Sequence, residues 1–170
     1  MELEEFDSLP FFRARYFLQG LKLRDERKGY YQADGRFELH LTNPGVGRVV
    51  ARVQRGGVVL PDQACVFEDG KELKVVALLP EKGDYELLLF SQDAETDNAH
   101  FGSVFIHSTR GATGLLPDYR TSFFEQGLAL ENPDQGLFLV QDEAVVRVSR
   151  TSNEVRVTAN LVNAEGEVQK

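Results

Sequence analysis

Cys65 is the only cysteine in this 170-residue chain and the side chain best suited to nucleophilic chemistry. A thiol nucleophile needs a base within hydrogen-bond reach and usually a helix N-terminus that favours the thiolate. The run Ala64-Cys65-Val66-Phe67 is typical of a strand and offers neither. We therefore expect Cys65 to be a buried structural residue.

The three histidines, His40, His100 and His107, do not have the spacing of a metal site on a helix. His40 alternates with Glu38 and Thr42 on the polar side of a predicted strand, so we expect it at the surface.

The stretch Asp93-Ala94-Glu95-Thr96-Asp97-Asn98 alternates carboxylates as a calcium loop would. An EF-hand loop needs glycine at its sixth position and a bidentate glutamate at its twelfth, and here Asn98 and Val104 stand there. We expect a solvated loop instead.

Gly45-Val46-Gly47 and Gly56-Gly57 open no helix whose N-terminus would hold a phosphate, so we interpret both as hairpin turns. The sequence thus predicts no catalytic, cofactor-binding or metal-ligating residue, and no cofactor.

Composition narrows the class of partner. A formal net charge of -8 disfavours nucleic acid and anionic membranes, so we expect protein partners. No apolar run is long enough to cross a membrane, and the N-terminus lacks the pattern of a signal peptide. A single cysteine and the absence of any Asn-x-Ser/Thr acceptor indicate a reducing, intracellular setting.

Hydrophobic periodicity is mostly two, which predicts strands. Seven short strands bounded by turn residues are expected at 20–24, 36–42, 48–55, 64–68, 72–79, 84–91 and 101–108. Seven strands at this spacing are typical of an all-β, immunoglobulin-like antiparallel β-sandwich. Tyr85, which follows the turn at Lys82-Gly83, predicts a tyrosine corner, so we give it a structural role.

An internal repeat appears when Leu116 to Gly136 is aligned on Leu9 to Gly29, an offset of 107 residues with nine identical positions. The sequence therefore predicts a tandem fold: a sandwich at 1–109, a linker at 110–115 and a partial second unit at 116–170 with the first strands only. We expect that the chain is a fragment or that another chain supplies the missing strands, because a cut sandwich leaves unpaired edges. This leaves open self-association through the incomplete unit.

The repeated segment reads Tyr-Phe-x-Gln-Gly-Leu-x-Leu in the first copy and Phe-Phe-x-Gln-Gly-Leu-x-Leu in the second. It resembles the immunoglobulin-like repeats that follow the transglutaminase-like domain in kyphoscoliosis-peptidase and hillarin-type proteins. The resemblance implies a cytoplasmic, often cytoskeleton-associated protein whose catalytic Cys-His-Asp set lies in another domain. Arg24-Asp25-Glu26 and Glu131-Asn132-Pro133 replace that family's Ser-His-Pro stretch, so no site residue is carried over.

Aromatic residues near the start, Phe11, Phe12, Tyr16 and Phe17, could form a patch that binds a partner, extended by Tyr30-Tyr31. Phe12 and Phe17 recur as Tyr119 and Phe124, which favours core packing for these two.

The function predicted is a non-catalytic protein-interaction or scaffold module that acts by strand addition or through its loops. Two alternatives remain: an accessory domain shaping substrate access for an upstream cysteine peptidase or transglutaminase-like domain, and a carbohydrate-binding or adhesion sandwich.

Overall fold

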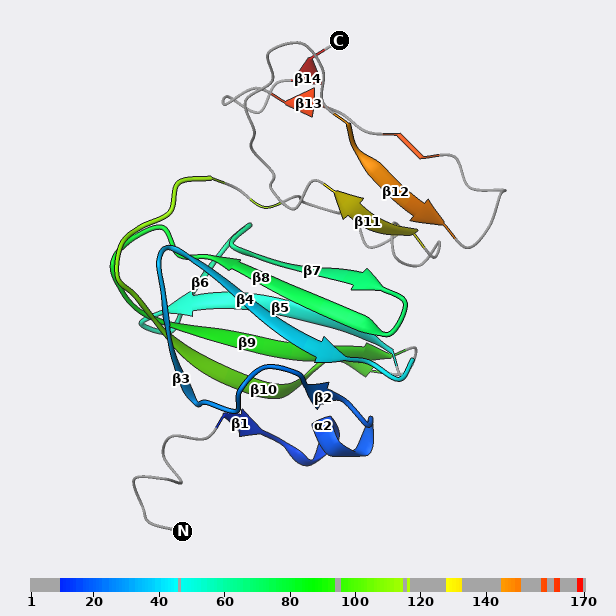
Figure 1. Cartoon of the computed structure of the whole chain (residues 1–170), viewed down its shortest axis with the longest axis horizontal. Helices are drawn as coiled ribbons and strands as arrows, with labels where there is room; N and C mark the ends of the chain where they lie inside the picture. The colour runs from blue at the N-terminus through cyan, green and yellow to red at the C-terminus, as the bar shows by residue number, and fades with distance from the viewer. Residues whose placement is uncertain are drawn as a thin grey trace.

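Two sheets packed face to face form the main body of the protein (Figure 1). The computed structural model describes residues 10–45, 47–93, 96–114, 116, 128–132, 145–150, 157–158, 161–162 and 168–169. The four-stranded sheet has the order β2 (Lys22–Leu23), β4 (Arg36–Thr42), β8 (Glu72–Leu78), β7 (Ala64–Asp69). The six-stranded sheet has the order β1 (Phe11–Phe12), β10 (Thr96–Ser108), β9 (Gly83–Asp93), β5 (Arg48–Arg55), β6 (Val58–Leu60), with β3 (Tyr30–Ala33) also on β10.

This strand order is that of an immunoglobulin sandwich, in which strands A, B, E and D face strands C, F and G. The predicted all-β immunoglobulin-like fold is confirmed. All seven predicted strands are present, and β4 and β5 have the predicted bounds.

Alternating apolar residues explain why the two sheets pack. Each strand directs every second side chain inward, as Leu39, Val53, Leu87 and Ile106 show, all fully buried. These side chains and their neighbours form one continuous core between the sheets.

Both short strands at the start of the chain pair with the same edge of β10. β1 runs antiparallel to it at Phe12 and Gly102, and β3 runs parallel to it from Tyr30 beside Phe105. Together they cover an edge that would otherwise present unpaired backbone groups.

The interpretation of Gly45-Val46-Gly47 as a hairpin turn is wrong. β4 ends at Thr42 in the four-stranded sheet and β5 begins at Arg48 in the six-stranded sheet, so these two strands do not form a hairpin. Gly56 and Gly57 do form a two-residue hairpin turn, with φ of 56° and 82°, and Arg55 pairs with Val58.

Core packing at the start of the chain is only partly as predicted. The segment after β1 is a short helix, α2 (Ala14–Leu18). Tyr16 is its buried residue, and Phe12 stacks on that ring at 4.1 Å. Phe17 is 65% exposed, which corrects the prediction that it packs in the core.

Four further strands are described after residue 116: β11 (Leu128–Asn132), β12 (Arg147–Arg150), β13 (Leu161–Val162) and β14 (Val168–Gln169). Ala129 pairs with Ser149 and Leu130 with Val148, just as Lys22 pairs with Thr42 and Leu23 with Leu41. The β11–β12 register therefore equals the β2–β4 register after the 107-residue offset. The division into two units, with its boundaries and linker, stays a prediction.

Candidate functional site

The outer side of the six-stranded sheet carries large apolar side chains that the core does not use. Five of them lie on adjacent strands, and we call them the aromatic face: Phe11, Tyr30, Leu88, Phe90 and Phe105. Phe11, Tyr30 and Phe105 are 55%, 51% and 49% exposed. Solvent-facing sides of antiparallel sheets are usually polar, so this surface is unusual.

Strand register places these side chains together. Phe105 of β10 lies opposite Tyr30 of β3 on one side and Glu86 of β9 on the other. Two residues back along β10, Ser103 lies between Phe11 and Leu88. Because alternate residues of a strand share a face, the five side chains occupy one side of the sheet.

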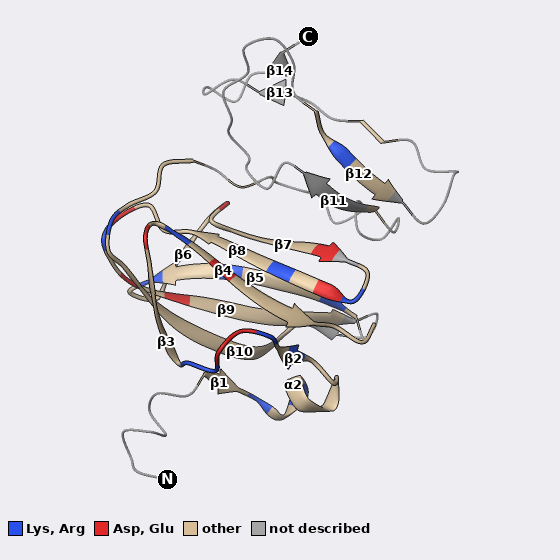
Figure 2. Cartoon of the chain, viewed as in Figure 1, with Lys and Arg blue, Asp and Glu red and all other residues tan. Residues whose placement is uncertain are grey.

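Arginine side chains lie over two rings of the aromatic face. The Arg52 guanidinium lies 5.0 Å from the centre of the Phe90 ring, and that of Arg13 lies 5.7 Å from the Phe11 ring. From Phe101 to Ser108, β10 contains no Lys, Arg, Asp or Glu. Figure 2 shows β10 in tan beside β9, part of which is red.

A polar cluster stands at one end of the aromatic face. The Tyr30 hydroxyl donates to Asp84 Oδ1 at 3.0 Å, and His107 Nδ1 lies 2.7 Å from the same oxygen. The hydrogen bond from His107, and to a smaller extent the one from Tyr30, lowers the pKa of Asp84. The pKa of Tyr30 is raised, mainly because its hydroxyl loses contact with solvent and secondly because it bonds the Asp84 carboxylate.

An imidazole that is hydrogen-bonded to a carboxylate, as His107 is to Asp84, can act as a general base. To activate a nucleophile, it must also lie within hydrogen-bond reach of that nucleophile. The nearby hydroxyl of Ser108 is fully buried and donates to the Arg110 carbonyl. The Tyr30–Asp84–His107 cluster therefore ties β3 to the β9–β10 hairpin.

The predictions for Cys65 and His40 can be compared directly with the structure. Cys65 is 6% exposed, which confirms a buried cysteine. The His40 side chain is 46% exposed, as expected for a surface position, and its Nδ1 lies 3.3 Å from the Asp25 carboxylate.

His100 lies at the other end of the aromatic face. Its Nε2 is 3.0 Å from Ser103 Oγ, and its ring is 5.3 Å from the Phe90 ring. The pKa of His100 is lowered, mainly by partial burial and secondly by the nearby positive charge of Arg13.

The prediction of a loop at 93–98 is wrong for four of its residues, because Asp93 ends β9 and Thr96-Asp97-Asn98 begin β10. Residues 94 and 95, and the side chains of the whole stretch, lie outside the described ones. Among described residues, no three His, Cys, Asp or Glu side chains are grouped so that they could hold a metal ion. Within the same residues, no helix is long and apolar enough to span a membrane.

Sequence reasoning named Phe11 and Tyr30 as a candidate patch but missed Phe105, Leu88 and Phe90. The unbroken apolar run from Leu87 to Phe90 indicates such a patch, because it gives the strand apolar side chains on both faces. Only one of these faces can pack in the core, so the other needs a separate cover.

No family model and no curated protein matches the sequence. Among solved structures, the titin M10–obscurin like 1 Ig complex in space group P1 is 18% identical over 49% of this chain and 87% of that chain, with a TM-score of 0.28. A mutant of the same complex is 19% identical over 49% and 86%, with a TM-score of 0.29.

Proposed function

We propose that this chain is a non-catalytic protein-interaction module that binds a protein partner through the aromatic face. The observation that carries the proposal is the group of half-exposed rings of Phe11, Tyr30 and Phe105 on one outer sheet surface. Exposed apolar patches of this kind mark interaction sites, because burying them on binding is favourable.

The composition of the aromatic face supports a protein partner. Aromatic residues and arginine are enriched in protein–protein interfaces, and here Arg13 and Arg52 lie over rings of that face. The chain's net charge of -8 opposes binding to phosphate backbones or anionic lipids.

The wider setting that we propose is a larger, cytoplasmic, cytoskeleton-associated protein of the kyphoscoliosis-peptidase type, with any catalytic Cys-His-Asp set in another domain. Its support is the repeated Gln-Gly-Leu-x-Leu segment at Gln19 and Gln126. In that setting the module positions the protein on its partner and takes no part in bond cleavage.

The test is affinity capture from lysate with the wild-type chain and Phe105→Glu as baits, followed by binding measurements with each purified candidate. A glutamate at the centre of the aromatic face should abolish retention of the specific partner, because a charge would be desolvated in the interface. Val58→Glu is the matched control, since Val58 is 65% exposed and lies on the outermost strand β6, outside the aromatic face. Equal retention by Phe105→Glu and wild type would refute the proposal.

A further inference from the structure

The outer surface of the four-stranded sheet is divided into a charged half and an apolar half. On β4 the outward side chains are Arg36, Glu38, His40 and Thr42. Beside them, β8 and β7 present Val76, Leu78, Cys65 and Phe67, which lie on this outer side by their register with β4. The apolar half is a second hydrophobic cluster, separate from the core between the sheets.

This apolar half is covered although it faces away from the core. Val76 is fully buried, and Cys65, Phe67 and Leu78 are 6%, 7% and 7% exposed. In sequence, β8 changes from alternation to an unbroken apolar run that continues one residue past the strand, Val75-Val76-Ala77-Leu78-Leu79. A strand of this kind is buried on both faces, so the outer face of the first sandwich requires a cover.

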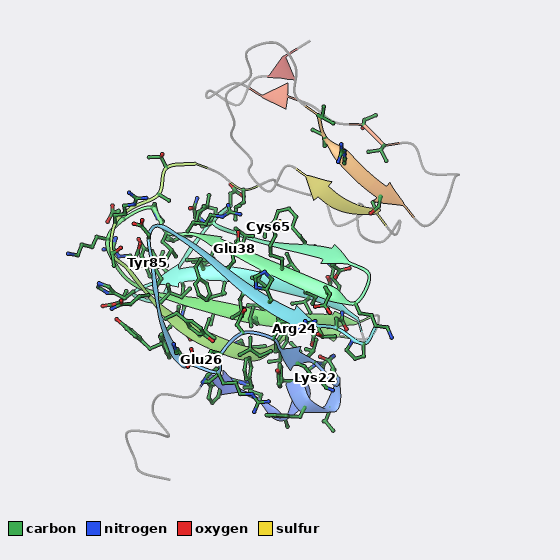
Figure 3. The ribbon with its side chains drawn as sticks, in the orientation of Figure 1. Lys22, Arg24, Glu26, Glu38, Cys65 and Tyr85 are labelled. Carbon is green, nitrogen blue, oxygen red and sulfur yellow. The ribbon has the colours of Figure 1, made fainter. Side chains whose placement is uncertain are left out.

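The cover comes from the segment of chain after the sandwich. Leu116 is 3% exposed and belongs to the same cluster, Ala112 and Val148 pack against it, and β11 lies beside β7. Figure 3 shows Cys65 on the side of the sandwich next to the β11–β12 pair.

Backbone hydrogen bonds hold the segment that follows β10 against the sandwich. Its amides at Thr109, Ala112 and Leu116 donate to the carbonyls of Ala33, Leu79 and Asp62, at 2.8, 2.9 and 3.2 Å. At Gly111 the connection lies so close to the sandwich that a Cβ would be 2.2 Å from the Pro80 carbonyl oxygen. A flexible linker would not need such contacts.

We propose that the apolar half-face formed by Cys65, Phe67, Val76 and Leu78 is a docking surface for the same chain's Leu116 and β11–β12 pair. Docking holds the sandwich and the β11–β12 pair together as one rigid body and shields the Cys65 thiol from solvent. Residues 110–114 then act as a fixed connection between them. The aromatic face is therefore held in a constant orientation relative to the β11–β12 pair.

Cys65 is the only cysteine, so its rate of modification by a soluble disulfide reagent reports opening of this cover under native conditions. Leu116→Asp and Val148→Asp should each raise that rate about tenfold or more, because each places a charge in the apolar contact. Val145→Asp is the matched control, since Val145 lies three residues before Val148 and is 57% exposed. Its rate should stay within about twofold of wild type, the change expected of a surface substitution.

A second variant acts on this connection alone: Gly111→Val should also raise the rate, through the clash with Pro80. Urea titration of every variant separates opening of the cover from global unfolding. Val104→Ala is the reference for global unfolding, because Val104 lies in the core between the sheets and not under the cover. If Leu116→Asp does not fold, Leu116→Ala carries the same expectation with a smaller rise. The proposal is overturned if the modification rate of Cys65 stays at the wild-type value in folded Leu116→Asp and Val148→Asp. It is also overturned if that rate follows only the free energy of global unfolding in all variants.

Discussion

The Tyr85 hydroxyl accepts a hydrogen bond from the Glu81 backbone N–H and donates one to the Glu81 carbonyl, each at 3.0 Å. Tyr85 is 2% exposed, and its ring closes the end of the core where the chain crosses from β8 to β9 (Figure 3). This is the tyrosine corner that the sequence predicts, and it fixes the crossing between the two sheets.

Replacing Tyr85 with phenylalanine removes both bonds and leaves two backbone groups of Glu81 without this partner. We expect Tyr85→Phe to lower the free energy of unfolding by about 1–3 kcal/mol, with an unchanged slope in urea. Tyr30→Phe is the control, because Tyr30 is half exposed and its hydroxyl bonds a solvated carboxylate. An equal loss in both variants would contradict a special role for the corner.

The strands and the corner could be predicted because their signals are local. β4 alternates strictly from Arg36 to Thr42, so its period alone gives its bounds. β3 could not be predicted, since Tyr30–Ala33 forms a strand only by pairing with β10, which lies far away in sequence. Pairing of this kind is a tertiary contact that no short window contains.

The candidate site was predicted less well for a similar reason. An apolar residue at a strand position can face either the core or solvent, and the choice depends on which neighbours it meets. Phe17 recurs in the repeat, yet Tyr16 occupies the buried side of α2 and Phe17 is left exposed. Phe105 is exposed while Val104 and Ile106 on the same strand are fully buried.

Gly102 allows β1 to approach β10. A Cβ at this position would lie 2.4 Å from Phe12 Cδ1 and 3.1 Å from the Phe11 carbonyl oxygen. Gly102→Ala should therefore displace β1 and lower the free energy of unfolding by about 1–3 kcal/mol, the usual cost of overpacking. Amide hydrogen exchange should show the loss at Arg13, whose N–H donates to the Phe101 carbonyl at 2.8 Å.

Gly57→Asn is the control for Gly102→Ala. Gly57 has a φ of 82°, which asparagine tolerates, and a Cβ there would meet nothing within 4 Å. A wild-type exchange pattern in Gly102→Ala would show that β1 is not held by this contact.

Glu68 on β7 is half buried, and burial raises its pKa, partly offset by the charge of Arg48. Because the pKa of Glu68 is higher in the folded than in the unfolded protein, its carboxylate destabilises the fold when it is charged. This destabilisation is absent below the ordinary pKa of 4.5 and is largest once the pH is above the folded pKa. Glu68→Gln should therefore be more stable than wild type at pH 7, with a difference that shrinks as pH falls towards 4.5. Urea titrations of both proteins across this range measure it, and Glu26→Gln, with an exposed side chain, controls for loss of a carboxylate. A constant difference at all pH values would exclude burial of the charge as its cause.

Asp84 shows the opposite shift, because the hydrogen bonds from His107 and Tyr30 lower its pKa. A folded pKa below the unfolded one contributes stability above the ordinary value of 3.8, and that contribution is lost as pH falls through the folded pKa. Asp84→Asn should therefore be less stable than wild type near neutral pH, and the two should converge under acidic conditions. Carboxyl-carbon NMR titration gives the pKa directly, and His107→Leu should move it upward towards 3.8, since leucine has no donor and removes the largest cause of the shift. An unchanged Asp84 pKa in His107→Leu would mean that the 2.7 Å contact with His107 does not lower it.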